Sequence, residues 1–355
     1  MQGVKIKLLI LTLLICLGLP SRAAAGSIGG MPYVIYNSTY GAEYGVIGRI
    51  MNYLGYHESL TLAATWIENG GNINNFTLSF PDQDYRHGKV YDLAVDLEGA
   101  IGTYISERYY GLGSDTPGTN YTTCDNRHTR IEILFTRASQ KNFSLAAGLL
   151  LAGNSFSNIK QGSNPLTQNL QEICAQYYAG SVSLNFDNRD KSMDPRAGNY
   201  ILAGFDFGIA AAESPAKYAK LTVDLRRYDT PFQKDQVLAS RLMLSQMTGD
   251  VIPIYEYASL GGRDTLRGYT MERFRDTSAA LINLEYRFPL FWVFSGAVFC
   301  ETGKVGPRLL ELGLNDWASD LGAGLRINFG NVIVRGDFGH SREGTNAYFF
   351  YDQAF

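Results

Sequence analysis

The side chains that most often carry catalysis do not form a recognisable constellation in this sequence. Four histidines, His57, His87, His128 and His340, are scattered along the chain, and no Gly-x-Ser-x-Gly motif offers an activated serine. No set of histidines and cysteines has the spacing of a zinc site. We therefore expect a protein that is not an enzyme and that uses neither a metal nor another cofactor.

Cysteine is the other residue type with chemistry of its own. Cys124, Cys174 and Cys300 follow the N-terminal segment, and an odd count in an oxidising compartment leaves at most one bridge and one thiol. Cys124 and Cys174 fall on the same side of the membrane in the strand order given below, so a disulfide between them is geometrically allowed. Two separate thiols are the alternative.

The N-terminus predicts export. Lys5 and Lys7 precede an apolar stretch, residues 8–19, and three alanines at 23–25 form a small-residue cleavage site. This layout is typical of a cleavable secretory signal over residues 1–25 rather than of an uncleaved anchor. The mature chain, 26–355, would then be a single domain. Its net charge of −3 and pI near 5.9 give no basic footprint, which argues against nucleic acid as a partner.

Strand-length alternation of apolar and polar residues predicts the elements that position everything else. In 219–226, for example, Ala219, Leu221 and Val223 oppose Lys220 and Thr222. Charges collect on one face only, as expected when one face of a closed sheet meets lipid and the other a hydrated lumen. With 23 Tyr, 19 Phe and 38 Gly, the composition favours an all-β, antiparallel outer-membrane β-barrel over a secreted sandwich or propeller.

The segments predict sixteen strands. They lie at about 32–40, 44–54, 58–69, 74–82, 89–102, 121–137, 142–156, 176–187, 199–211, 217–228, 236–247, 278–288, 292–304, 319–329, 331–340 and 346–355. A further apolar run, 250–260, is assigned to a loop because Pro253 and Gly261-Gly262 bracket it. With a periplasmic N-terminus, the long connections 103–120, 157–175 and 248–277 face outward and the short ones inward, as in bacterial barrels.

The segment Gly261-Gly262-Arg263-Asp264-Thr265-Leu266-Arg267-Gly268-Tyr269, ahead of the last five strands, carries a family resemblance. It resembles the sixth-loop motif of the BamA/TamA-type outer-membrane insertase and translocator superfamily, also called the bacterial surface antigen barrel. Weaker matches run along the chain, among them Arg108–Asp115, Asp187–Asp190, Gly296–Gly303 and Gly322–Arg326.

The resemblance implies roles for particular residues. The sixth extracellular loop would fold into the lumen, with Leu266, Arg267, Gly268 and Tyr269 as its motif and Glu285 and Glu301 as the acidic partners of Arg267. The family usually has Asp where this chain has Glu301, which keeps the charge and lengthens the reach. The aromatic ending, with Phe349, Tyr351 and Phe355 on one strand face, resembles the sorting signal read by the barrel-assembly machinery. The first strand follows the signal closely, so we expect a form without the periplasmic POTRA domains of its relatives.

Two functions remain open on these grounds. The first is assistance to insertion or translocation of a protein or lipid client in the outer membrane of a Gram-negative bacterium, among outer-membrane lipids and lipopolysaccharide. It would need a weak seam between the first and last strands, and Pro32 removes one ladder donor there. The second is a passive channel or structural barrel without insertase activity.

Overall fold

A computed structural model of the protein describes residues 26–160, 176–211, 216–232, 235–249, 252–329, 332–351 and 353–355. The predicted signal, residues 1–25, and Cys174 lie outside these ranges, so the cleavage site and the Cys124–Cys174 bridge stay predictions. None of the described helices is long and apolar enough to cross a membrane.

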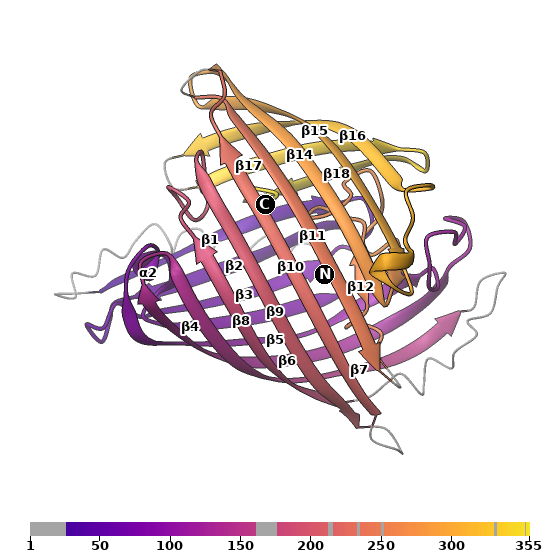
Figure 1. Cartoon of the computed structure of the whole chain (residues 1–355), viewed down its shortest axis with the longest axis horizontal. Helices are drawn as coiled ribbons and strands as arrows, with labels where there is room; N and C mark the ends of the chain where they lie inside the picture. The colour runs from indigo at the N-terminus through magenta and orange to yellow at the C-terminus, as the bar shows by residue number, and fades with distance from the viewer. Residues whose placement is uncertain are drawn as a thin grey trace, which may run out of the picture.

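Sixteen antiparallel strands in the described chain form a closed barrel (Figure 1), as predicted. They are β1 (Ser27–Asn37), β2 (Gly41–Met51), β3 (Ser59–Ile67), β4 (Asn72–Phe80), β5 (Tyr91–Tyr109), β6 (Thr122–Gln140), β7 (Phe143–Lys160), β8 (Gln176–Asp187), β9 (Gly198–Ala211), β10 (Ala216–Asp229), β11 (Val237–Gly249), β14 (Ser278–Phe291), β15 (Phe294–Gly306), β16 (Ala318–Phe329), β17 (Val332–Ser341) and β18 (Gly344–Phe350). Each pairs with its chain neighbour, and β1 meets β18 to close the wall.

Burial follows the alternation that the sequence predicts. On β14, Ile282 and Leu284 are 46% and 45% exposed, whereas Asn283 and Glu285, which alternate with them, are buried. The apolar side chains therefore cover the outer face of the wall, and the polar ones point inward.

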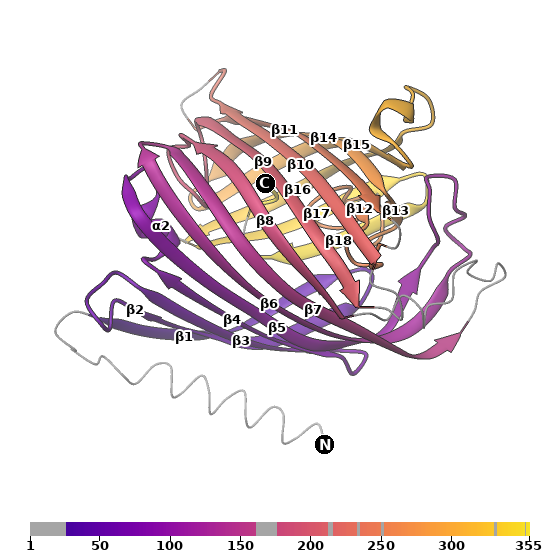
Figure 2. The same ribbon diagram turned by 60° about the horizontal axis from the view of Figure 1, so that its bottom comes forward.

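Between β11 and β14 the chain leaves the wall. Residues 252–277, here called the inner loop, contain only the short strands β12 (Ala258–Leu260) and β13 (Phe274–Asp276), which pair with each other apart from the barrel. Assigning the run 250–260 to a loop was therefore correct. Figure 2 shows β12 and β13 beside the last strands of the barrel, and β12 contacts both β14 and β15.

Several predicted boundaries were wrong. Strand β1 begins at Ser27 rather than at residue 32, so Pro32 lies within the strand and not at its start, and β7 ends at Lys160 rather than at residue 156. Strand β5 runs to Tyr109 rather than residue 102, and the register shift between Tyr104 and Glu107, with Ser106 at φ 58°, breaks the alternation that the prediction relied on. Strand β18 ends at Phe350 rather than at residue 355, because Ala354 and Phe355 turn away from the ladder and pack in an apolar cluster.

The connection between β4 and β5 carries α2 (Gln83–Arg86), a single helical turn. Asp82 is its N-cap and accepts hydrogen bonds from the backbone N–H groups of Asp84 and Tyr85. A second short helix, η1 (Leu309–Glu311), lies between β15 and β16.

Candidate functional site

A tight glycine turn sets the shape of the inner loop before the tetrad Leu266–Tyr269. Gly261 and Gly262 adopt φ values of 117° and 99°, a region that side-chain-bearing residues rarely reach. A Cβ on Gly261 would lie 2.3 Å from the carbonyl oxygen of Thr270. The turn is closed by Thr265, whose Oγ1 accepts a hydrogen bond from the Gly261 backbone N–H at 2.8 Å. These contacts bring the following residues back against the barrel wall.

Arg267 is fully buried and meets three carboxylates. Its Nη1 donates to Glu285 Oε2 at 2.6 Å and to Asp337 Oδ2 at 2.9 Å, and its Nε donates to Glu301 Oε1 at 3.0 Å. The backbone N–H of Arg267 donates to the other oxygen of Glu301 at 2.6 Å. Its guanidinium also lies 3.4 Å from the ring centroid of Phe299.

The wall supplies a balanced set of charges around this arginine. Four arginines and four carboxylates, none more than 5% exposed, gather on the inner face of β14–β17 and the inner loop: Arg267, Arg287, Arg326, Arg335, Glu285, Glu301, Asp320 and Asp337. Burial alone would lower the pKa of the Arg267 guanidinium, but the carboxylates of Glu301, Glu285 and Asp337 raise that pKa well above its ordinary value. Buried charges are tolerated only when paired in this way.

Gly268 lets the loop backbone touch the wall. Its N–H donates to Asp320 Oδ2 at 2.9 Å, and its carbonyl accepts from Ser341 Oγ at 2.7 Å and from Asn346 Nδ2 at 2.8 Å. A Cβ on Gly268 would lie 2.4 Å from Asp320 Cβ, and one on Gly339 of β17 would lie 2.5 Å from the carbonyl carbon of Arg267. Glycine on both sides is therefore what allows this close approach.

The two flanking members of the tetrad complete the attachment. Leu266 is fully buried in an apolar cluster with Leu260, Phe274 and Leu281. Tyr269 packs its ring edge-on against Phe274, with centroids 5.1 Å apart, and its carbonyl accepts from the hydroxyl of Tyr348 on β18 at 2.8 Å. All four residues of the motif thus contact the last strands of the barrel.

The structure brings Arg267 together with both carboxylates expected from the sequence, Glu285 and Glu301. Sequence reasoning missed Asp337 and Asp320, which complete the set. Asp337 could have been predicted from the same alternation of side chains. It lies on the inward face of β17 with Arg335 and Gly339, whereas the neighbouring Phe338 is exposed on the outward face. The contact of Gly268 with Asp320 had no such signal, because it depends on how the loop docks.

The C-terminal aromatics do not share a strand face, which corrects the prediction for the ending. Phe349 lies on β18 and is 37% exposed, Tyr351 lies just beyond the strand, and Phe355 is buried. Phe355 packs with Tyr228 and Val237, and its backbone oxygen accepts from Arg287 Nη2 at 3.3 Å.

The closing pair of strands is joined over a short length. Strands β1 and β18 pair at two positions, Tyr36 with Phe349 and Asn37 with Tyr348, whereas β1 and β2 pair at eleven. Ser38 adds a link at the outer end of this seam, where its Oγ accepts from the Ala347 backbone N–H at 2.7 Å. Within the described chain, residues 27–35 of β1 have no ladder partner on β18.

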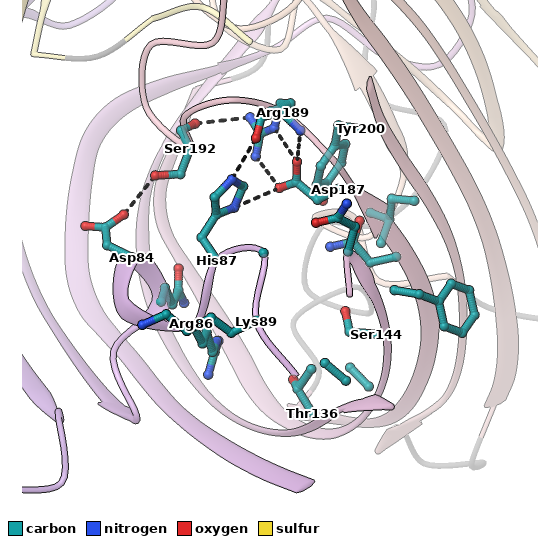
Figure 3. Close-up of a pocket in the computed structure, with 18 of the residues that line it drawn as sticks. Asp84, Arg86, His87, Lys89, Thr136, Ser144, Asp187, Arg189, Ser192 and Tyr200 are labelled. Carbon is teal, nitrogen blue, oxygen red and sulfur yellow. Dashed lines mark hydrogen bonds and ion pairs between the residues drawn. The ribbon is translucent and has the colours of Figure 1, made fainter. Parts of the chain in front are cut away.

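A polar pocket of about 570 Å³ lies between α2, the β8–β9 connection and the wall (Figure 3). It is at the end of the barrel where β1 begins, here called the inner mouth. His87 Nε2 lies 3.0 Å from the carbonyl oxygen of Arg189, and Ser192 Oγ donates to Asp84 at 2.8 Å. Arg189 in turn binds Asp187 through Nε and Nη2. These contacts tie two connections that are four strands apart, and nothing in the spacing of the sequence predicted them. Among the described residues, no group of three or more His, Cys, Asp or Glu is placed to hold a metal ion.

Several solved structures resemble this chain in fold. BamA from Haemophilus ducreyi lacking POTRA domains 1–3 matches with a TM-score of 0.63 at 14% identity, covering 92% of this chain and 70% of that one. CdiB from Escherichia coli matches with a TM-score of 0.59 at 14% identity, covering 94% and 63%, and CdiB from Acinetobacter baumannii with 0.57 at 10% identity, covering 92% and 59%. The chain thus spans less than two thirds of either CdiB. At these identities the likeness concerns the fold.

A search of curated proteins finds no match. The family model described as the Omp85 superfamily domain matches residues 52–345, which is most of the chain. A closed sixteen-stranded barrel with this domain identifies the protein as a member of the Omp85 superfamily.

Proposed function

We propose that the protein lies in the outer membrane of a Gram-negative bacterium and assists the insertion or translocation of a protein or lipid client by opening between β1 and β18. The observation that carries this proposal is the seam, with two paired positions against eleven in the neighbouring β1–β2 pair. In hydrocarbon, each unpaired backbone polar group costs several kcal/mol. The free edge of β1 is therefore a place where another strand, or a lipid-exposed segment of a client, gains hydrogen bonds.

The inner loop holds one side of this seam firmly. Its residues Gly268 and Tyr269 accept hydrogen bonds from Asn346 and Tyr348 of β18. On the β1 side, the Met271 backbone N–H donates to Thr39 Oγ1 of the β1–β2 turn at 2.9 Å. The last strands are thus fixed to the loop and to one another, while β1 is held chiefly by β2. Opening would move β1 and its neighbours relative to a rigid β14–β18 wall.

A disulfide across the seam tests the proposal. Tyr36→Cys and Phe349→Cys form a directly paired, outward-facing couple, introduced into a chain whose own cysteines are replaced by serine. Cells lacking the protein would be complemented with this variant, and the protein and lipid content of their outer membranes measured with and without reductant. We expect loss of complementation under oxidising conditions and recovery on reduction.

The matched control locks a pair that does not cross the seam. Phe338→Cys and Ala347→Cys join β17 to β18 at a directly paired, outward-facing position, and this variant should complement under both conditions. Full complementation by the oxidised seam variant would contradict the proposal.

A passive channel is the second candidate, and the charged pocket at the inner mouth favours it. The inner loop separates the two functions, because a loop fixed against the wall narrows the lumen. Single-channel recordings on the purified barrel should show small or intermittent currents if the first proposal holds. A large, steady current from the unmodified protein would favour the channel.

A further inference from the structure

The outer face of the barrel carries a groove that the proposed opening does not use. It crosses β1 to β6 and has a volume of about 670 Å³. Two rows of outward-facing residues border it, one running from Gly30 through Gly48 and Leu62 to Ile131, the other from Val46 through Ala64 and Asn74 to Thr129. The strand backbone between the two rows forms its floor. Residues between the two rows, among them Ile47, Ala63 and Ala100, line the groove at this floor. The two bordering rows face outward, so the groove opens toward lipid.

The groove is bordered by small residues at its β1 end and carries polar side chains toward its β6 end. Near β1 its borders are small, with Gly30, Gly48 and Ala64 leaving the floor uncovered, and bulky side chains such as Leu62, 52% exposed, rise beside them. Toward β6 the second row presents Asn74 and Thr129, both exposed. An apolar channel that carries two polar groups in its half toward β6, with Ile101 between them, has the outline of a lipid chain and its attachment point.

Asn74 and Thr129 are the informative residues. Both point outward on a wall whose other exposed side chains are mostly apolar, and within the described residues neither side chain has a hydrogen-bond partner. Polar side chains facing hydrocarbon without a partner are costly and rare, and they usually mark a functional contact. An amide and a hydroxyl together both donate and accept hydrogen bonds.

The level of the groove indicates which leaflet it meets. Tyr36, Tyr44 and Trp66 form an outward-facing aromatic group, with Tyr44 and Trp66 stacked at 6.5 Å, near the end of the barrel that carries the long connections. Such aromatic girdles lie at the membrane interface, and the long connections of these barrels are external. Ala64 lies two residues from Trp66, about 7 Å along the strand. The groove therefore begins just below the outer interface.

We propose that this groove binds an acyl chain of lipopolysaccharide in the outer leaflet. The root of the chain, with its amide and hydroxyl groups, would meet Asn74 and Thr129, and the tail would extend over Gly48 toward Gly30 on β1. A phospholipid ester only accepts hydrogen bonds, so it would satisfy these two side chains less completely. The inference rests on the outer-membrane location proposed above but not on opening of the seam.

Photo-crosslinking in defined bilayers tests the site directly. The full chain would be placed in nanodiscs containing lipopolysaccharide with a diazirine on an acyl chain, or phosphatidylethanolamine carrying the same label. Labelled peptides would then be located by mass spectrometry. We expect lipopolysaccharide to label residues 41–67 at least five times more than residues 237–247 of β11, on the opposite wall.

Two variants with one matched control decide the outcome. Ala64→Trp fills the groove and Asn74→Leu removes the polar contact, and each should abolish the preference. Ala147→Trp, an equally outward-facing alanine on β7, should leave it unchanged. Circular dichroism would establish that all three variants are folded. Equal labelling around the barrel, or an equal preference for the phospholipid probe, would overturn the proposal. A seam variant locked by disulfide should still show the lipid preference, which separates failure of this site from failure of the proposed function.

Discussion

Replacing Arg267 by alanine should release the inner loop from the wall. The substitution leaves four buried carboxylates facing three arginines, and Glu285, Glu301 and Asp337 each lose a direct partner within 3.0 Å. Removing one partner of a buried ion pair costs about 3–5 kcal/mol. If that cost falls on docking of the loop, its undocked population rises by about 100- to 5,000-fold, at roughly 1.4 kcal/mol per factor of ten.

Hydrogen exchange over residues 258–276 measures this change, because amides exposed by undocking should exchange faster by the same factor. Arg227→Ala is the control, since Arg227 forms an exposed pair with Asp229 at the rim, and it should change exchange in the loop little. Arg267→Met combined with Glu301→Gln should restore part of the protection by balancing the charges again. If Arg267→Ala and Arg227→Ala give the same loop exchange, the ion network does not hold the loop, and the reasoning fails.

Three further substitutions test separate parts of the structure. Gly339→Ala should also raise hydrogen exchange in the inner loop, because the new Cβ would lie 2.5 Å from the carbonyl carbon of Arg267. Gly204→Ala is the control and should not raise it, because its Cβ would meet nothing closer than 3.9 Å. Equal protection of the loop in the two variants would show that the close approach is dispensable. Glu301→Asp shortens the side chain that binds both the backbone N–H and the guanidinium of Arg267. We expect hydrogen exchange in the inner loop to be faster than in the native chain and slower than in Arg267→Ala. Any other order would refute the role of Glu301 in holding the loop. Phe355→Ala should lower the free energy of unfolding by about 3–5 kcal/mol, as for other buried phenylalanines, measured by denaturant titration in detergent; a loss below 1 kcal/mol would mean that the tail does not pack as described.

Alternation of side chains was enough to predict the barrel, because the two faces of each strand meet different solvents. It succeeded on β10 and β14, where every second residue is apolar, and it failed at the end of β5, where the bulge at Ser106 resets the faces. The tail failed for another reason: Phe355 has the composition of a strand residue, but apolar partners on β10 and β11 hold it inside.

The residues of the site that lie on regular strands could be predicted from the sequence, and those that depend on loops could not. Glu285, Glu301 and Asp337 all occupy inward positions that alternation reveals, although only the first two were recognised. The partners of Gly268, and the contact of His87 with Arg189 at the inner mouth, depend on where loops settle in three dimensions. The spacing of residues along the chain does not predict these contacts.

The most direct test of the account is the width of the seam in a bilayer. Spin labels at Ile28 and Leu325 would span β1 to β16 across the seam, and labels at Ile28 and Leu78 would span β1 to β4 over the same number of strands within the continuous wall. Pulsed electron spin resonance should give a broad or two-peaked distance distribution for the first pair and one narrow peak for the second. Two equally narrow distributions would contradict the claim that the barrel opens between its first and last strands.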